Sequence, residues 1–215
     1  MTKFETLKVE GFEPAIYGMR LPLKSHSKSD SYYDENNNFI IGPNDYNLLK
    51  KLWKAGPEHR KAIRQIQVWV NVSAARFFFQ EWDTYKIGTT ANSSSTMHTL
   101  LKEDFSYDQF EWPSCSGSDW DIEAAFKDYI DILKTVRDRA NESSGEEKEH
   151  YHQILKAMLP ESFIQKRTVN LNYETLATMY RQRKNHRLPQ WNTTFVSWIK
   201  TLPYNELITG KFNEE

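Results

Sequence analysis

Residues 66–87 read IQVWVNVSAARFFFQEWDTYKI and contain the change of hydrophobic period that decides the fold. The first seven residues place an apolar side chain at every second position, which is typical of a half-buried strand. After Ser73, which can cap a helix, Ala74, Phe77, Phe78, Trp82 and Tyr85 recur at helical spacing, and Gly88 marks an end. We therefore expect a strand at residues 66–72 that leads into a helix at residues 74–87.

Helix signals predominate over the rest of the chain, whereas residues 1–42 carry Gly, Pro and polar clusters that predict a short strand or two and a long loop. Five further helices are expected: between Gly42-Pro43 and Gly56-Pro57, over residues 121–138, from the capping box Ser143-Ser144-Gly145-Glu146 to Pro160, after the capping residue Asn172, and from about Gln190 through Ile199. With no internal repeat and no long linker, we predict an α+β fold, a small mixed sheet flanked by several helices, in one domain over residues 1–215.

The charge balance limits the classes of partner. The 28 Lys and Arg residues against 29 Asp and Glu residues give a net charge of -1, so no bulk attraction to nucleic acid or to an anionic membrane is expected. The single cysteine, Cys115, cannot form an intrachain disulfide, and no apolar run of about 20 residues could span a bilayer. Because Met1 is not followed by an apolar run either, we expect a cytoplasmic protein.

A hydroxyl-rich segment follows the predicted aromatic helix. Residues 85–96 read YKIGTTANSSST and collect hydroxyls, an amide and a cation around a glycine that lets the backbone come close to a ligand. These groups can donate hydrogen bonds to phosphate or sugar oxygens. The same composition is typical of a polar surface loop, and the sequence leaves both interpretations open.

A basic cluster, RQRKNHR at residues 181–187, lies at the end of the helix that Asn172 begins. Cations at a helix C-terminus suit the helix dipole, so one interpretation is a solvated helix end. The other is a phosphate clamp, in which Arg183 and Arg187 form an i, i+4 pair. Motifs of the common hydrolases, zinc proteases, P-loop and dinucleotide-binding proteins are absent, and His150 and His152 lack a second pair of ligands, so no metal site is predicted.

Short motifs in the second half of the chain resemble flavin-dependent thymidylate synthases, the ThyX family. Met158-Leu159-Pro160 and Thr168-Val169-Asn170 are followed by a helix that ends in Arg183 and by Gln190-Trp191. The family reads Leu-Pro, Thr-Val-Asn, a helix ending in Leu-Arg, and Ala-Gln-Trp at these places. The resemblance extends over about residues 45–200.

The family's signature, RHRxxSxNExSxRY, aligns with residues 84–97, where only Ser94 is identical. Thr84-Tyr85-Lys86 stands in place of Arg-His-Arg, and Glu174 stands in place of an arginine that contacts the flavin. The resemblance implies substrate contacts from Ser94, Arg183, Lys86 and Lys156, and cofactor contacts from Thr89, Asn92 and Asn172. The basic cluster adds Arg187 as a further predicted substrate contact.

The chemistry implied by the resemblance is reductive methylation of dUMP to dTMP, with FAD supplying hydride, methylenetetrahydrofolate supplying carbon and NADPH reducing the flavin. It needs no nucleophile from the protein, so no catalytic residue is assigned. The resemblance also implies a homotetramer. Two functions therefore stand: a divergent flavin-dependent enzyme acting on a pyrimidine nucleotide, or a non-catalytic nucleotide-binding or sequestering protein that keeps the fold and has lost the flavin site.

Overall fold

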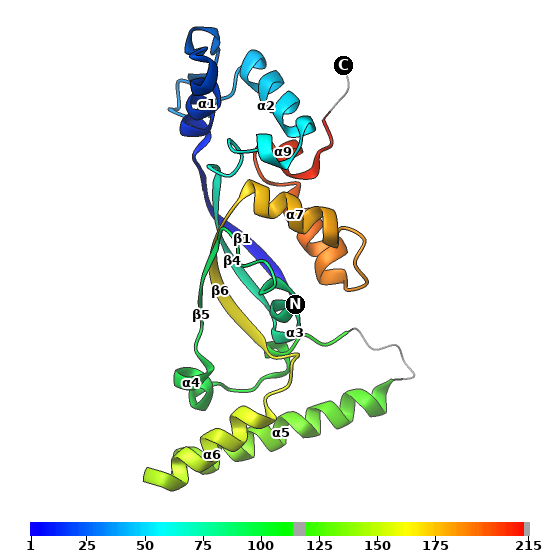
Figure 1. Cartoon of the computed structure of the whole chain (residues 1–215). Helices are drawn as coiled ribbons and strands as arrows, with labels where there is room; N and C mark the ends of the chain where they lie inside the picture. The colour runs from blue at the N-terminus through cyan, green and yellow to red at the C-terminus, as the bar shows by residue number, and fades with distance from the viewer. Residues whose placement is uncertain (114–118, 213–215) are drawn as a thin grey trace. The chain divides into compact units, whose positions relative to one another are not determined.

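The computed structural model describes residues 1–113 and 119–212, so Cys115 lies outside the described residues. Within them, the main sheet has four strands in the order β1 (Lys3–Glu10), β4 (Gln67–Ala75), β6 (Ile164–Asn172) and β5 (Thr89–Ser93) (Figure 1). Two short strands, β2 (Tyr32–Tyr33) and β3 (Phe39–Ile40), form a separate antiparallel hairpin. Sheets and helices together confirm the α+β class.

The helices form two groups by length. The longer ones are α1 (Phe12–Arg20), α2 (Pro43–Ala55), α3 (Arg76–Trp82), α5 (Trp120–Glu142), α6 (Gly145–Met158) and α7 (Tyr173–Arg183). The short ones are α4 (Thr96–Thr99), α8 (Val196–Ile199), α9 (Glu206–Thr209), a π-helical turn at Gln190–Phe195, and 3-10 turns at Leu21–Leu23, His26–Lys28, Pro57–His59, Leu100–Lys102 and Tyr107–Gln109. Among the helices described, none is both long and apolar enough to cross a membrane.

Strands β4 and β6 pair in an antiparallel sense. The Tyr173 amide just beyond β6 donates to the carbonyl of Ile66 just before β4, at 3.1 Å, and the Thr168 hydroxyl donates to the Asn71 side chain at 2.7 Å. Residue numbers thus rise along one strand as they fall along the other. The pairing places the two strands that carry the alternating apolar side chains side by side.

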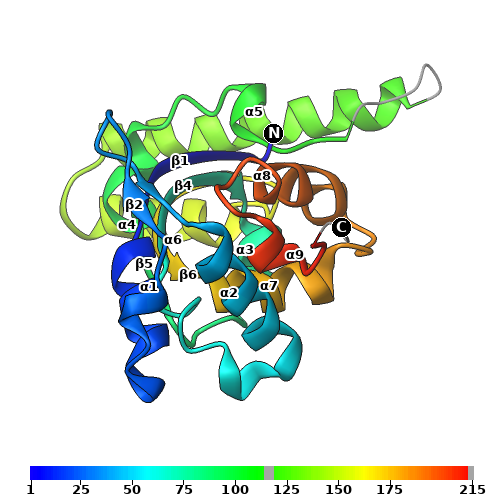
Figure 2. The same cartoon turned by 90° about the horizontal axis from the view of Figure 1, so that it is seen from above.

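The chain divides into two compact units, each with its own packing. Unit 1 comprises Met1–Lys3, Val72–Thr84 and Asn92–Arg167, and unit 2 comprises Phe4–Asn71, Tyr85–Ala91 and Thr168–Glu215. In unit 1, α5 and α6 lie side by side (Figures 1 and 2). Both helices contribute to a hydrophobic cluster of Leu100, Phe105, Phe110, Ile130, Leu133, Leu155, Leu159 and Phe163. In unit 2, α7 packs against α9, and α9 against α2 (Figure 2).

The strand predicted at residues 66–72 is confirmed as β4, with Val68, Val70 and Val72 fully buried. The helices predicted at residues 43–55 and after Asn172 are confirmed as α2 and α7, and the one predicted at 121–138 extends to Trp120–Glu142. The helix predicted from about Gln190 is present as the π-helical turn and α8.

Other expectations for the elements were wrong at their boundaries. The helix predicted at 74–87 covers only Arg76–Trp82, because Ala74 and Ala75 are buried within β4. The predicted capping box at 143–146 is absent, since α6 begins after Ser144 with no side-chain cap. The hydroxyl-rich stretch predicted as a loop contains strand β5, which takes the edge position beside β6.

A helix, α1, occupies residues 12–20, where a loop was predicted. Pro14 lies in its first turn, where the missing amide costs no helical hydrogen bond, and Ala15 and Ile16 are buried. Gly11 precedes it with φ +99°, and a Cβ there would lie 2.3 Å from the Gln65 carbonyl oxygen, so only glycine fits. Pro14 and Gly11 thus begin this helix and do not prevent it.

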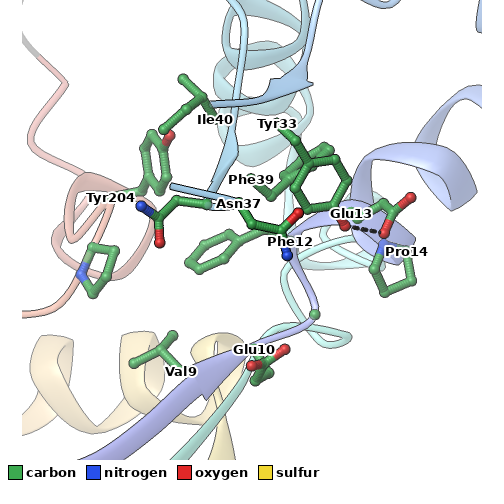
Figure 3. Close-up of a pocket in the computed structure, with 13 residues that line it drawn as sticks. Val9, Glu10, Phe12, Glu13, Pro14, Tyr33, Asn37, Phe39, Ile40 and Tyr204 are labelled. Carbon is green, nitrogen blue, oxygen red and sulfur yellow. Dashed lines mark hydrogen bonds between the residues drawn. The ribbon is translucent and has the colours of Figure 1, made fainter. Parts of the chain in front are cut away.

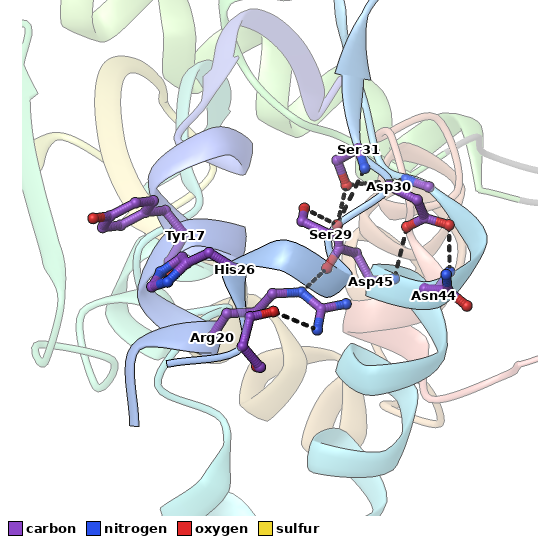
Figure 4. Close-up of polar contacts among 10 residues, drawn as sticks. Tyr17, Arg20, His26, Ser29, Asp30, Ser31, Asn44 and Asp45 are labelled. Atoms are coloured by element: carbon purple, nitrogen blue, oxygen red, sulfur yellow. Dashed lines mark hydrogen bonds and ion pairs between the residues drawn. The ribbon is translucent and has the colours of Figure 1, made fainter. Parts of the chain in front are cut away.

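A closed ion pair holds α1 and α2 of unit 2 together (Figure 4). The Arg20 Nε donates to Asp45 Oδ1 at 2.5 Å, and the hydroxyls of Ser29 and Ser31 both donate to Asp45 Oδ2 at 2.6 Å. Asp45 is fully buried and Arg20 nearly so. Burial alone would raise the pKa of Asp45, but the hydrogen bonds from both serines and from Arg20, with the charge of Arg20, lower it.

Asp45→Ala should lower the free energy of unfolding by about 3–5 kcal/mol, because it leaves the Arg20 guanidinium buried without its partner. Asp30→Ala is the control: Asp30 accepts from the amides of Asn44 and Asp45 at the start of α2, and its loss should cost about 1 kcal/mol. Urea unfolding measures both.

The contribution of Asp45 to the free energy of unfolding should decrease as the pH falls. Since the pKa of Asp45 is lowered in the folded state, the stabilisation is complete above the ordinary carboxyl pKa and is lost as the pH falls through the lowered value. The difference in stability between the native protein and Asp45→Asn should stay constant down to about pH 4 and narrow below it. Equal losses from Asp45→Ala and Asp30→Ala, or a difference that widens in acid, would contradict this role.

Candidate functional site

Helix α7 positions the basic cluster in unit 2. Its buried face consists of Tyr173, Leu176, Ala177, Met179 and Tyr180, which fixes the rotation of the helix about its axis. At its start, the Asn172 side chain accepts the Thr175 amide at 2.9 Å, so the predicted cap is confirmed. Residues 85–88 run beside the helix, because the Thr175 hydroxyl donates to the Ile87 carbonyl at 3.0 Å.

Gly88 allows this close approach. With φ +71° it has a backbone conformation that other residues rarely adopt, and a Cβ there would lie 2.4 Å from the Asn172 side-chain nitrogen. The N-terminal cap of α7 and the turn before β5 are therefore in direct contact.

Arg183, at the end of α7, is held by two aromatic rings. Its Nε donates to the Tyr85 hydroxyl at 2.9 Å, and that hydroxyl donates to the Gln182 side chain at 2.8 Å. The guanidinium carbon lies 5.6 Å from the centre of the Tyr85 ring and 5.3 Å from that of Trp191, within cation–π range. Arg183 is half-buried, so its charge is fixed in direction and partly shielded from water.

A cavity of about 230 Å³ lies beside the same helix, within unit 2. Three cationic side chains line it, Arg60, Arg181 and Lys184, together with the indole of Trp53 and the hydroxyl residue Thr178. The Arg60 guanidinium lies 4.0 Å from the centre of the Trp53 ring and 3.8 Å from a Glu174 oxygen, whereas Arg181 and Lys184 are exposed. The cavity combines positive charge with a flat aromatic wall.

The Thr89 hydroxyl, on β5, and the second carboxylate oxygen of Glu174, on α7, are buried and make no hydrogen bond within the described residues. Burial raises the pKa of Glu174, against the opposing charges of Arg60, Arg64 and Arg181. Buried polar groups usually have a partner, so both atoms are suited to a polar ligand.

Unit 1 carries a different part of the predicted site. The Ser94 hydroxyl accepts the Lys166 amide at 3.3 Å, the Ser94 amide donates to the Lys166 carbonyl, and the Ser94 carbonyl accepts from the Gln165 side chain. The Lys156 ammonium contacts the Met97 sulfur. Ser94 thus extends the β5–β6 pairing by one residue, with its side chain exposed.

The predicted residues fall in both units. Arg183, Thr89, Asn172, Lys86 and Arg187 lie in unit 2, and Ser94, Asn92 and Lys156 lie in unit 1. Lys86, Asn92 and Arg187 are exposed.

The predicted i, i+4 pair of Arg183 and Arg187 is wrong, because α7 ends at Arg183 and Arg187 lies in the following bend.

Several residues of these clusters had no signal in the sequence. Tyr85 was predicted as an apolar position of a helix and as the first residue of the hydroxyl-rich segment, and neither prediction made it the partner of Arg183. Arg60 and Trp53 were not singled out, and in unit 1 neither was Arg167, whose guanidinium lies 3.9 Å from the Phe79 ring centre and pairs with Asp83 at 2.7 Å. Among residues 1–113 and 119–212, no three His, Cys, Asp or Glu side chains gather as a metal ion would need.

The sequence matches no protein-family model and none of the curated proteins with which it was compared. Its structure is similar to a crystal structure of thymidylate synthase X (ThyX) from Helicobacter pylori with FAD and dUMP, with a TM-score of 0.72 and 14% identity over 98% of each chain. A second structure, of flavin-dependent thymidylate synthase ThyX from Helicobacter pylori complexed with FAD and dUMP, gives 0.71 and 15%, over 97% of this chain and 98% of that one. The fold that the motifs predicted is confirmed.

Proposed function

From the thymidylate synthase X fold of this chain, we propose that it binds a pyrimidine nucleotide, with Arg183 as the principal contact to the phosphate. The main observation behind the proposal is the position of Arg183 against the rings of Tyr85 and Trp191, with its Nε bonded to the Tyr85 hydroxyl. A guanidinium that is already oriented loses little conformational entropy when it binds an anion. Lys86 and Arg187, both exposed in unit 2, are proposed as further phosphate contacts.

The cavity beside α7 has the chemistry of a second phosphate site. Arg60, Arg181 and Lys184 would hold a diphosphate, and the indole of Trp53 offers a surface for a planar ring. The Thr89 hydroxyl, which does not line this cavity, is buried without a hydrogen bond and can donate one to a bound molecule. These residues fit a flavin nucleotide such as FAD, and Asn172 is a further proposed contact.

The reaction proposed for the loaded protein is reductive methylation of dUMP to dTMP. Bound FAD, reduced by NADPH, would supply the hydride, and methylenetetrahydrofolate the carbon. The chain's own part is to bind and orient the nucleotide through Arg183 and to shield it with aromatic side chains. From the resemblance, Ser94 is proposed as a pyrimidine contact, Lys156 as a phosphate contact and Asn92 as a cofactor contact.

A second function is favoured by one observation, the acidic residue Glu174 next to Arg60, a cation that lines the cavity beside α7. Its carboxylate pairs with Arg60, and it stands where the resemblance predicts an arginine that contacts flavin. A protein with this change could bind a nucleotide without catalysing a reaction.

The absorbance of the purified protein distinguishes the two functions. A flavin-binding protein is yellow and shows the flavin bands, and that is the expected result. A colourless protein that acquires no bands when mixed with FAD, and still binds dUMP, would support the non-catalytic function.

We further propose a cytoplasmic homotetramer, since the resemblance implies four chains and the one cysteine of the sequence cannot form an intrachain disulfide. Light scattering at micromolar concentration should give four times the chain mass of 25.4 kDa. A monomer would exclude any site that needs residues from two chains.

Arg183→Ala should weaken dUMP binding by about ten- to a hundredfold, because a charge-assisted hydrogen bond contributes about 1.5–3 kcal/mol. Ser94→Ala should cost less, about 0.5–1.5 kcal/mol, since its hydroxyl is uncharged. Calorimetric titration with dUMP, dTMP and other nucleotides, at low and moderate salt, measures both changes.

Arg139→Ala is the matched control, because Arg139 is an exposed cation at the end of a different helix, α5. It should leave the affinity unchanged. If Arg183→Ala binds dUMP as tightly as this control, or if no nucleotide binds the native protein, the basic cluster is a solvated helix end.

A further inference from the structure

A second cavity of unit 2, of about 520 Å³, lies at the start of α1 (Figure 3). The end of β1, the first turn of α1, the β2–β3 hairpin and the turn before α9 enclose it. Its residues play no part in the proposed nucleotide site, since it shares none with the cavity beside α7. Cations line the cavity beside α7, whereas acidic residues line this one.

Two carboxylates and no cations line this cavity. Glu10 and Glu13 contribute the charge, and the other eleven of the thirteen lining residues are neutral. Lys8 pairs with Glu10 at 2.9 Å, but both side chains are more than half exposed, so this pair is weak. The cavity therefore presents a net negative charge.

The carboxylate of Glu13 has a hydrogen-bond partner in the cavity wall. The Tyr33 hydroxyl donates to Glu13 Oε2 at 2.5 Å (Figure 3), and this bond is the main cause that raises the pKa of Tyr33. The hydroxyl thus stays a donor, and Glu13 Oε1 keeps its acceptor capacity.

Aromatic rings form two sides of the cavity. Phe12 and Tyr204 meet edge to face with their centres 5.3 Å apart, and so do Tyr33 and Phe39, also at 5.3 Å. Figure 3 shows these rings around the space between the hairpin and α1. The faces of aromatic rings attract cations. The carboxylates beside these rings attract cations as well.

The walls are held by bonds outside the cavity. Asp34 accepts the amides of Asn36 and Asn38, which closes the turn of the hairpin, and the Tyr204 hydroxyl accepts the Ile41 amide at 3.0 Å. The cavity walls are therefore largely in position before a ligand binds.

We propose that this cavity binds a small organic cation, an alkylammonium compound whose charged group lies between the carboxylates of Glu10 and Glu13 and whose carbon chain lies on the aromatic rings. An anion is the alternative that the first turn of α1 could attract. The two carboxylates oppose it, and Glu13, which lies within that turn, already offsets the positive end of the helix.

Calorimetric titration of the full chain with diaminobutane tests the proposal, with butanediol as the uncharged analogue of the same length and inorganic phosphate as the anion. We expect diaminobutane to bind, more weakly as salt rises, and the diol not to bind. Phosphate, which the proposed nucleotide site can hold, should bind equally to the native protein and to the variants of Glu10 and Glu13. Glu13→Gln and Glu10→Gln should each weaken it about three- to tenfold, and Phe39→Leu about two- to fivefold. Nucleotide affinity should not change in these variants, which separates this inference from the proposed function.

Two further variants make the test specific. Glu35→Gln removes a carboxylate from the turn of the same hairpin, outside the cavity, and should not alter binding. Tyr33→Phe keeps the ring and frees Glu13 Oε2, so affinity should stay equal or rise. Equal binding of the diol, phosphate binding that becomes stronger in Glu10→Gln or Glu13→Gln, no binding of diaminobutane, or unchanged diaminobutane affinity in both Glu10→Gln and Glu13→Gln would overturn the proposal.

Discussion

The antiparallel pairing of β4 and β6 is the constraint on which the site in unit 2 depends. Its last bond, from the Tyr173 amide to the Ile66 carbonyl, coincides with the residue where β6 ends and α7 begins. Val169 and Leu171 are fully buried on one face of β6, so a slip of one residue would turn them to the other face. The register of the sheet therefore fixes where α7 starts, and the length of α7 then places Arg183.

The charges of unit 2 fall into two kinds that differ in exposure. Arg20 and Asp45 are buried and satisfy each other with the help of Ser29 and Ser31, which is the pattern of a structural ion pair. Arg181 and Lys184 are exposed at the rim of a cavity, next to a half-buried Arg60. Cations left at a cavity in this way are suited to a ligand, whereas a closed pair is suited to holding two helices together.

The sequence was informative where one local period decides the structure. The alternation from Ile66 to Val72 predicted β4, and the capping role of Asn172 follows from its side chain and the apolar stripe after it. Strand β6 was not predicted, because Gln165, Lys166 and Arg167 make its first half polar. Strand β5 was taken for a loop for the same reason, since an edge strand can be built of Thr, Ser and Asn.

For the proposed site, the sequence predicted Arg183 and could not predict the residues that contact it. Tyr85 lies 98 positions away, and the Arg60–Trp53 stack forms only when the turn after α2 folds back on that helix. The two carboxylates at the start of α1 had no signal either, because the aromatic rings that complete their cavity come from distant segments. Contacts between segments that are far apart in the chain leave no periodic pattern in the local sequence, so the sequence does not predict them.

Hydrogen–deuterium exchange of the native protein, with and without dUMP, tests the central claim most directly, because it locates the ligand without any substitution. The account predicts slower amide exchange on adding dUMP at residues 85–89 and 180–191, around Arg183 and its two rings, and little change around Arg20 and Asp45. Unchanged exchange in both of these segments at saturating dUMP would contradict the assignment of this site.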